Sequence, residues 1–198
     1  MPLFSTRTVP TPSRRHADAF LLAQLQDGVR ERQALAQNYS HIITSVGALA
    51  MVDDVPQALR NAYESLPAGG LFLAAFYGGN TLHELRASLL AAETAITGGA
   101  ARRVAPMIDA ATAASLLQRA GFSLPVTDTE MLTATYTSPQ ALVADLRAAS
   151  MTGVLADQRP LPRAVWAVAC NHYATHFATH DGRIGATFET IFLSGWKD

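Results

Sequence analysis

The sequence has little of what several protein classes require. Only 16% of its 198 residues are charged, 49% are hydrophobic, and the net charge is −1. Disordered chains combine few hydrophobic residues with many charges, so this composition excludes disorder. A nucleic-acid groove needs an excess of basic residues, so we expect no nucleic-acid partner. The low share of charge also indicates that a partner covers part of an apolar surface.

Cysteine and long apolar runs are scarce as well. Cys170 is the only cysteine, so the chain forms no internal disulfide and fits a reducing compartment. No run approaches the ~18 consecutive apolar residues of a membrane span, and the longest candidate, residues 164–170, is too short. We therefore expect a cytoplasmic protein with no membrane span.

Apolar spacing, glycine and proline divide the rest of the chain into helices and strands. Continuous apolar or threonine-rich segments predict strands at 39–46, 71–77, 126–137 and 186–196. Helical spacing predicts helices at 13–37, 55–66, 81–97, 109–120, 138–150 and 161–179. Strands separated by helices imply crossover connections. We expect an α/β fold with a mostly parallel sheet of about four strands, the last one antiparallel, and helices on both faces.

The same pattern predicts a single domain over residues 13–198, preceded by a flexible N-terminal arm at residues 1–12. Residues 1–15 lack acidic side chains and are similar in composition to a transit peptide. Pro2, Pro10 and Pro12 disrupt the helix that such a peptide needs, which favours the flexible arm.

One turn combines features of a ligand site. It follows the predicted strand 71–77, and open α/β sheets bind ligands at the carboxyl ends of their strands. Free amides at the next helix start suit an anion, and arginine suits a carboxylate or phosphate. The candidate pocket comprises Tyr77, Gly78, Gly79, Asn80, Thr81 and Arg86, with Arg102 and Arg103 on the same side. The alternatives are a capping box formed by Thr81 and Glu84, and solvated surface arginines.

Two further clusters carry titratable side chains. His172, His176 and His180 are spaced four residues apart, so a continuous helix aligns them, and a neighbouring pair would chelate Zn²⁺ or Ni²⁺. The alternative is a polar helix face. Asp53 and Asp54 precede Pro56, which favours helix capping over an acid/base pair.

Several motifs follow one another in the order of a known family. They are Leu66-Pro67-Ala68-Gly69-Gly70, Gly78 to Arg86, Arg103 to Pro106, Leu116 to Phe122, and Ala186 to Lys197. This series resembles one branch of the class I S-adenosylmethionine-dependent methyltransferases. The branch contains a methyltransferase-like assembly factor of mitochondrial complex I and the malonyl-carrier-protein methyltransferases of biotin synthesis. The resemblance covers nearly the whole chain, and implies a Rossmann-like fold with S-adenosylmethionine as the family cofactor.

The chain departs from this family in two places. In the family, a first strand with a glycine-rich turn and a second strand ending in an acid precede the strand matched by residues 39–46. Those glycines and that acid hold the cofactor. Here a helix ends near Gln37 and the strand follows at once. Residues 48–51 also replace a Leu-His-Trp sequence that lines the family's pocket. The resemblance therefore implies a truncated fold with no cofactor-binding residue to assign.

These departures lead to a functional expectation. We expect a pseudoenzyme that acts through protein contacts, as an assembly-factor-like or regulatory subunit, with no cofactor for the isolated chain and unknown catalytic residues. The family sheet places its first strand beside its fourth, so Tyr39–Val46 is left as an edge. We expect the N-terminal helix, a protein partner or a second copy in a dimer to cover it. The alternative is a methyltransferase, acting on a small molecule or protein, whose cofactor site a partner chain completes.

Overall fold

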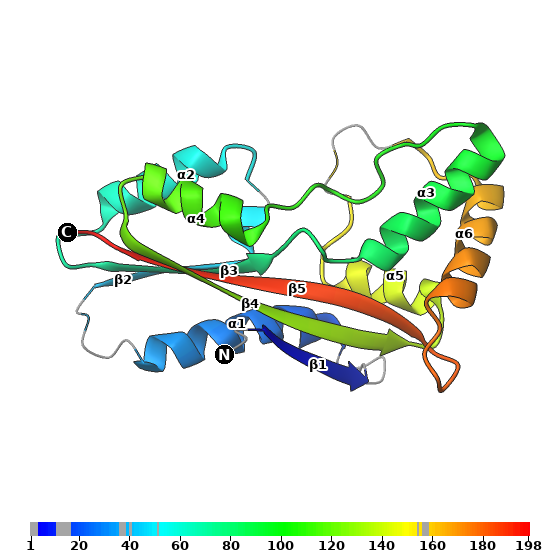
Figure 1. Cartoon of the computed structure of the whole chain (residues 1–198), viewed down its shortest axis with the longest axis horizontal. Coiled ribbons are helices and arrows are strands. Elements are labelled where there is room, and N and C mark those ends of the chain that lie inside the picture. Colours follow the sequence, from blue (N-terminus) through cyan, green and yellow to red (C-terminus); the bar gives the residue numbers. More distant parts are fainter. Residues whose placement is uncertain are drawn as a thin grey trace.

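The computed structural model describes residues 4–10, 17–35, 39, 41–50, 52–153, 155 and 159–198. A five-stranded sheet with the order β1-β4-β5-β3-β2 forms its centre (Figure 1). The strands are β1 (Phe4–Pro10), β2 (Ile42–Val46), β3 (Leu71–Tyr77), β4 (Ser123–Tyr136) and β5 (Ile184–Trp196). The helices are α1 (Ala17–Leu35), α2 (Val55–Ser65), α3 (His83–Thr97), α4 (Ala110–Arg119), α5 (Pro139–Ala148) and α6 (Arg163–His176), with a 3₁₀ turn η1 (Ala48–Ala50).

Strand directions agree with the sequence prediction. β1 pairs in parallel with β4, and β2 pairs in parallel with β3. β5 lies between β3 and β4 and runs antiparallel to both. The prediction of a mostly parallel α/β sheet whose last strand is antiparallel is confirmed. β3 has the predicted bounds, and the other predicted strands differ from the observed ones by a few residues at their ends.

The N-terminal segment differs from the prediction of a flexible arm. Residues Phe4–Pro10 form β1, which pairs with β4 from Phe4 opposite Thr129 to Pro10 opposite Thr135. Proline is tolerated in such an edge strand because its missing N–H removes no bond inside the sheet. The sheet therefore has five strands rather than about four. A seven-residue segment has little strand signal of its own, and the long strand β4 provides its partner.

Helices cover both faces of the sheet (Figure 1). β3 is buried along its whole length, and its side chains alternate between the two faces. Phe72 and Phe76 belong to the core under α2 and α4, whereas Ala75 and Tyr77 belong to the core on the α1 side. α3, α5 and α6 gather beyond the carboxyl end of β3 (Figure 1).

Short-range caps agree with the sequence. The Asp54 carboxylate accepts a hydrogen bond from the Gln57 amide at 2.8 Å, and so caps α2 as predicted. The Asp109 carboxylate accepts one from the Thr112 amide at 2.7 Å at the start of α4. Gly121 follows α4 with φ of 105°, the left-handed region that favours glycine after a helix.

Gly28 allows α1 to approach the sheet closely. A Cβ at this position would lie 2.4 Å from two carbons of the Phe192 ring on β5. Arg32 lies one turn further along α1 and covers the same ring, with its guanidinium carbon 3.4 Å from the ring centroid. Arg32 also forms an ion pair with Asp128 on β4. The missing side chain of Gly28 therefore permits the contact between α1 and the middle of the sheet.

We expect Gly28→Ala to lower the free energy of unfolding by about 1 kcal/mol. Overpacking costs about 2 kcal/mol at the middle of its usual range, and the gain of alanine over glycine in a helix offsets roughly 1 kcal/mol of this cost. Urea denaturation measures this change. Gly99→Ala is the control, since a Cβ there would meet nothing within 4 Å. Combining Gly28→Ala with Phe192→Leu should recover part of the loss, and a stabilised single variant would contradict the close approach.

Candidate functional site

The turn after β3 is built around a carboxylate of β5. Gly78 donates its backbone N–H to the Glu189 carbonyl oxygen at 2.8 Å. A Cβ on Gly78 would lie 2.6 Å from Ile191 Cδ1 and 2.8 Å from Glu189 Oε2, so a larger residue here would displace both side chains. The same Oε2 atom accepts a hydrogen bond from the Asn80 amide at 2.7 Å. The buried Glu189 carboxylate therefore accepts a hydrogen bond from the Asn80 amide, one of the amides that we expected to bind an anionic ligand.

Thr81 and Glu84 do not form the capping box that their spacing predicts. Leu82 is the residue before α3, with φ of 56°, and no side chain caps the helix. The Thr81 hydroxyl instead donates to the Glu189 carbonyl oxygen at 3.2 Å and accepts from the Glu189 amide at 3.1 Å. The Glu84 carboxylate accepts hydrogen bonds from the amide and the hydroxyl of Thr187. Both side chains join α3 to β5, because this strand passes beside the helix start.

The other predicted pocket residues also contact the protein itself. Tyr77 is buried, with its ring centroid 5.6 Å from that of Phe188. The Arg86 guanidinium donates to the carbonyl oxygens of Gly79 and Thr81, both at 3.1 Å, and so closes the turn. Tyr77, Gly78, Gly79, Asn80, Thr81 and Arg86 thus lie together, and their role in ligand binding stays a prediction.

A cavity of about 730 Å³ lies directly beyond this turn, between α3, α5 and α6. This volume is within the range of small-molecule sites. Its apolar wall includes Leu85 and Leu89 from α3, Leu146 from α5 and Trp166 from α6. Five arginines also line it, namely Arg102, Arg103, Arg147, Arg159 and Arg163. Arg102 and Arg103 thus line this cavity. The six other residues of the predicted pocket are not part of its described lining.

Arg103 is held by a buried carboxylate. Its Nε and Nη2 atoms donate to Glu93 Oε1 at 2.9 and 2.5 Å, and its Nη1 donates to the Arg159 carbonyl oxygen. The Ala101 amide donates to Glu93 Oε2 at 2.7 Å. Burial opposes ionisation of Glu93, but these hydrogen bonds and the Arg103 charge hold its pKa below the ordinary value. The ion pair therefore attaches the segment after α3 to the helix.

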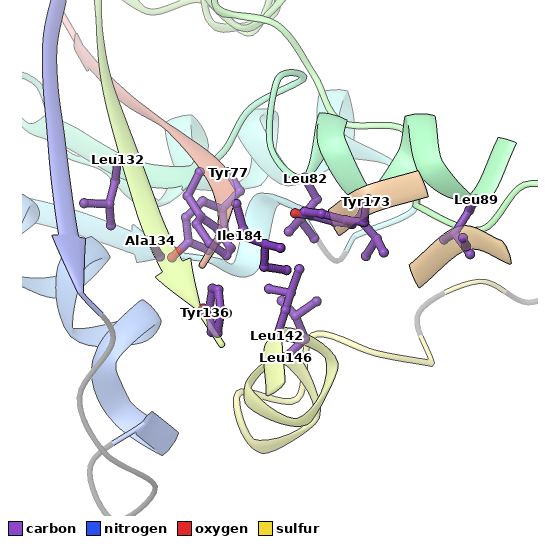
Figure 2. Packing of buried hydrophobic residues seen from close by; sticks show 14 of the residues in the cluster. Tyr77, Leu82, Leu89, Leu132, Ala134, Tyr136, Leu142, Leu146, Tyr173 and Ile184 are labelled. Atoms are coloured by element: carbon purple, nitrogen blue, oxygen red, sulfur yellow. The ribbon is translucent and has the colours of Figure 1, made fainter. Parts of the chain in front are cut away.

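Three tyrosines share the core behind the cavity (Figure 2). The Tyr136 hydroxyl donates to Asp145 Oδ2 at 2.7 Å, and the Tyr173 hydroxyl donates to the Gly185 carbonyl oxygen at 2.7 Å. Burial raises the pKa of Tyr77, Tyr136 and Tyr173, and the Asp145 charge raises the pKa of Tyr77 and Tyr136 further. All three phenols are therefore neutral at physiological pH.

The three histidines do not form one helical stripe. α6 ends at His176, so His180 lies beyond the helix that the sequence predicted to continue to residue 179. The rings of His172 and His176 stack with centroids 4.0 Å apart. Burial and the neighbouring His176 hold the pKa of His172 below its ordinary value. Within the described part of the chain, no group of three or more histidine, cysteine or acidic side chains is placed to hold a metal ion.

Residue spacing gave no signal for most of the cavity. Arg147, Arg163 and Trp166 were not predicted, because they come from two helices that meet only in the folded chain. The low overall share of charge made an arginine cluster still less evident.

None of the described helices combines the length and hydropathy needed to cross a bilayer.

Comparison with known proteins finds relatives of two kinds. No family model matches the chain. The chain is 31% identical over 162 residues to "Arginine-hydroxylase NDUFAF5, mitochondrial" of Homo sapiens, covering 81% of this chain and 47% of that protein. It is 29% identical over 169 residues to a malonyl-[acyl-carrier protein] O-methyltransferase of Gallionella capsiferriformans, covering 84% of this chain and 56% of that protein. Among solved structures, the YcgJ protein of a Bacillus species is 14% identical, with a TM-score of 0.48 over 79% of this chain and 63% of that one.

The chain spans about half the length of the curated relatives it matches. A 28% identical match to the NDUFAF5 protein of Danio rerio covers 98% of this chain and 61% of that protein, and so includes the motifs on β3, α3, α4 and β5 that carry the resemblance in the sequence. The α/β sheet, with its antiparallel last strand beside β3, agrees with that resemblance. The chain is therefore similar, over 81% and 84% of its length, to the NDUFAF5 and malonyl-carrier-protein methyltransferase proteins, the branch that its sequence motifs resemble.

Proposed function

We propose that this chain is a methyltransferase-like protein that acts through protein contacts at the outer edge of β2 and binds no S-adenosylmethionine by itself. One observation carries the proposal. β2 pairs with β3 on one side, and no other strand of the described chain pairs with its outer side. In the family sheet, this outer side belongs to the first strand. α1 contacts β2, β3 and β5, and within the described residues no strand covers the outer edge of β2.

The elements next to this edge do not fit the family cofactor. α1 ends at Leu35 and β2 begins at Ile42. Residues 36–41 are too few for two further parallel strands, because each crossover connection needs about a dozen residues or more. At the carboxyl end of β2, the turn η1 presents only Ala48, Leu49 and Ala50, whose side chains form no hydrogen bonds. The Asp54 carboxylate, which follows this turn, already accepts a hydrogen bond as the cap of α2.

The backbone of β2 is arranged to accept another strand. The Leu71 amide donates to the His41 carbonyl oxygen at 3.0 Å, and the Gly47 amide donates to the Ala75 carbonyl oxygen at 2.8 Å. Alternate residues of a parallel strand bond to the same neighbour, so Ile42, Thr44 and Val46 direct their N–H and C=O groups outward. The strand contains neither charge nor proline, which commonly protect an edge.

A second copy of the chain suits this edge. A two-fold axis at Thr44 makes the two strands antiparallel, with Thr44 opposite Thr44 and Ile42 opposite Val46. All three outward-facing residues of each copy are then hydrogen-bonded, and the sheet continues through both copies. The low share of charged residues fits such a covered edge.

We expect the wild-type chain to be a dimer by light scattering, and Thr44→Pro to weaken dimerisation at least tenfold. Proline removes the outward N–H of Thr44 without removing a bond to β3, so the monomer should keep its fold. Thr44→Val retains the N–H and is the matched control. Hydrogen exchange at Ile42 and Val46 should be slow in the wild type and fast in Thr44→Pro. A monomeric wild type with rapidly exchanging amides here would overturn the proposal.

Calorimetric titration with S-adenosylmethionine tests the other half of the proposal. We expect no binding to the wild-type chain or to Thr44→Pro. Low-micromolar binding to the isolated chain would instead support a methyltransferase. The expected cytoplasmic location stays a prediction, since the NDUFAF5 relatives are described as mitochondrial.

A further inference from the structure

We propose that the cavity between α3, α5 and α6 binds an anionic amphiphile, that is, a carboxylate or phosphate monoester carried on an apolar chain. The proposal concerns a different surface from the β2 edge, so each stands or fails without the other. It rests on the charge of the cavity lining, on its apolar wall and on the position of the α6 start.

The described lining is strongly positive. It contains five of the chain's 15 lysine and arginine residues and no aspartate or glutamate. Glu93 matches the charge of Arg103 from behind the lining. Arg102, Arg147 and Arg163 form no ion pair with any described residue. Three guanidinium groups around one cavity that have no counter-charge among the described residues attract an anion, and their paired N–H donors suit the oxygens of a carboxylate or phosphate.

The wall below these arginines is apolar. Leu82 precedes α3, Leu85 and Leu89 lie on α3, and all three are buried, as is Leu146 of α5. Figure 2 shows Leu82, just before α3, and Leu142 and Leu146 of α5 in the same part of the core. Trp166 of α6 adds an aromatic surface to this wall. An inorganic anion would leave the half-buried apolar side chains of the lining wet, among them Val143, Met151 and Trp166, whereas an alkyl chain would cover them and gain hydrophobic free energy.

The start of α6 adds to the positive potential. Arg163 is its first residue, and Pro160, Leu161 and Arg163 all line the cavity. Pro162 precedes the helix, and no side chain caps its first amides. The partial positive charge of a helix start therefore acts at the same cavity as the arginines. Arg102 reaches the cavity from the segment after α3 and Arg147 from the last turn of α5, so the cations surround the opening from three elements.

Calorimetric titration of the full chain with a set of matched probes tests this proposal. We expect dodecanoate or dodecyl phosphate, kept below their micellar concentrations, to bind with micromolar affinity. Dodecanol and dodecyltrimethylammonium should bind at least tenfold more weakly, because they lack the negative charge. Acetate and inorganic phosphate should show no measurable binding, because they lack the alkyl chain. The ratio of the two acidic probes then distinguishes a carboxylate from a phosphate ligand.

Two paired variants assign the binding to this cavity. Arg147→Gln combined with Arg163→Gln should weaken binding of the acidic probe at least tenfold, as expected for the loss of charge-assisted hydrogen bonds. Arg60→Gln combined with Arg119→Gln, exposed arginines on α2 and α4, is the control and should leave the affinity unchanged. Circular dichroism confirms that both double variants are folded. Equal affinity for dodecanol and dodecanoate, equal affinity of the two double variants, or no binding by the wild type would overturn the proposal.

Discussion

Glu93→Gln is expected to lower the free energy of unfolding by about 3 kcal/mol. The substitution keeps the shape of the side chain but leaves the Arg103 guanidinium, 14% exposed, without its counter-charge. Removal of one partner from a buried ion pair costs about 3–5 kcal/mol, because the other charge stays away from water. Urea denaturation measures the loss. Glu64→Gln, on the exposed side of α2, is the control and should change stability by less than about 0.5 kcal/mol.

A double-mutant cycle separates this pair from the rest of the core. Arg103→Met should destabilise the protein because it leaves the Glu93 carboxylate buried with fewer donors. The double variant Glu93→Gln with Arg103→Met should lose less stability than the sum of the two single variants, by at least about 1 kcal/mol. Additive losses would show that the two side chains do not interact as the structure describes.

The same carboxylate predicts a pH dependence of stability. The pKa of Glu93 in the folded chain lies below its ordinary value of 4.5, which the unfolded chain retains. The stabilisation is therefore complete above pH 4.5 and is lost as the pH falls through the lower, folded pKa. Wild type should lose more free energy of unfolding than Glu93→Gln below pH 4.5. Parallel pH profiles of the two proteins would contradict this result.

Glu84→Ala is expected to lower the free energy of unfolding by about 3 kcal/mol. The buried carboxylate accepts hydrogen bonds from both the amide and the hydroxyl of Thr187. Hydrogen bonds to charged groups contribute about 1.5–3 kcal/mol, and the variant leaves the Thr187 donors buried and unpaired. Thermal denaturation measures the loss, and Glu84→Gln should lose less because its amide oxygen still accepts one bond.

Hydrogen exchange distinguishes this role from helix capping. Glu84→Ala should accelerate exchange of the Thr187 amide on β5, which a capping side chain would leave unchanged. Loss of a helix cap costs about 1 kcal/mol, well below the effect expected here. A loss of stability near 1 kcal/mol, with slow exchange of the Thr187 amide, would instead support the capping box as the role of Glu84.

Local patterns settled most of the secondary structure. β3 was predicted with its observed bounds because seven consecutive apolar residues between glycines describe a strand buried on both faces. Asp54 capped α2 as expected, because its partner amide is three residues away. The end of α6 was missed, since the sequence after His176 contains no glycine or proline until Gly182.

The candidate site was predicted less well than the fold. The turn from Tyr77 to Arg86 was located correctly, but its side chains contact the protein instead of lining the cavity. Thr81 pairs with Glu189, and Glu84 with Thr187, across more than 100 residues of sequence. Spacing within one helix cannot reveal that a distant strand supplies better partners.

Sequence patterns alone established the alternating elements, the family resemblance and the position of the turn after β3, because each depends on residues close together in the chain. Long-range packing added β1 to the sheet, left β2 at its edge and brought the arginines of three segments to one cavity. These features depend on strand pairing and helix contacts between distant residues. Hydrophobic burial and hydrogen bonding select such contacts for the chain as a whole, and no local pattern encodes them.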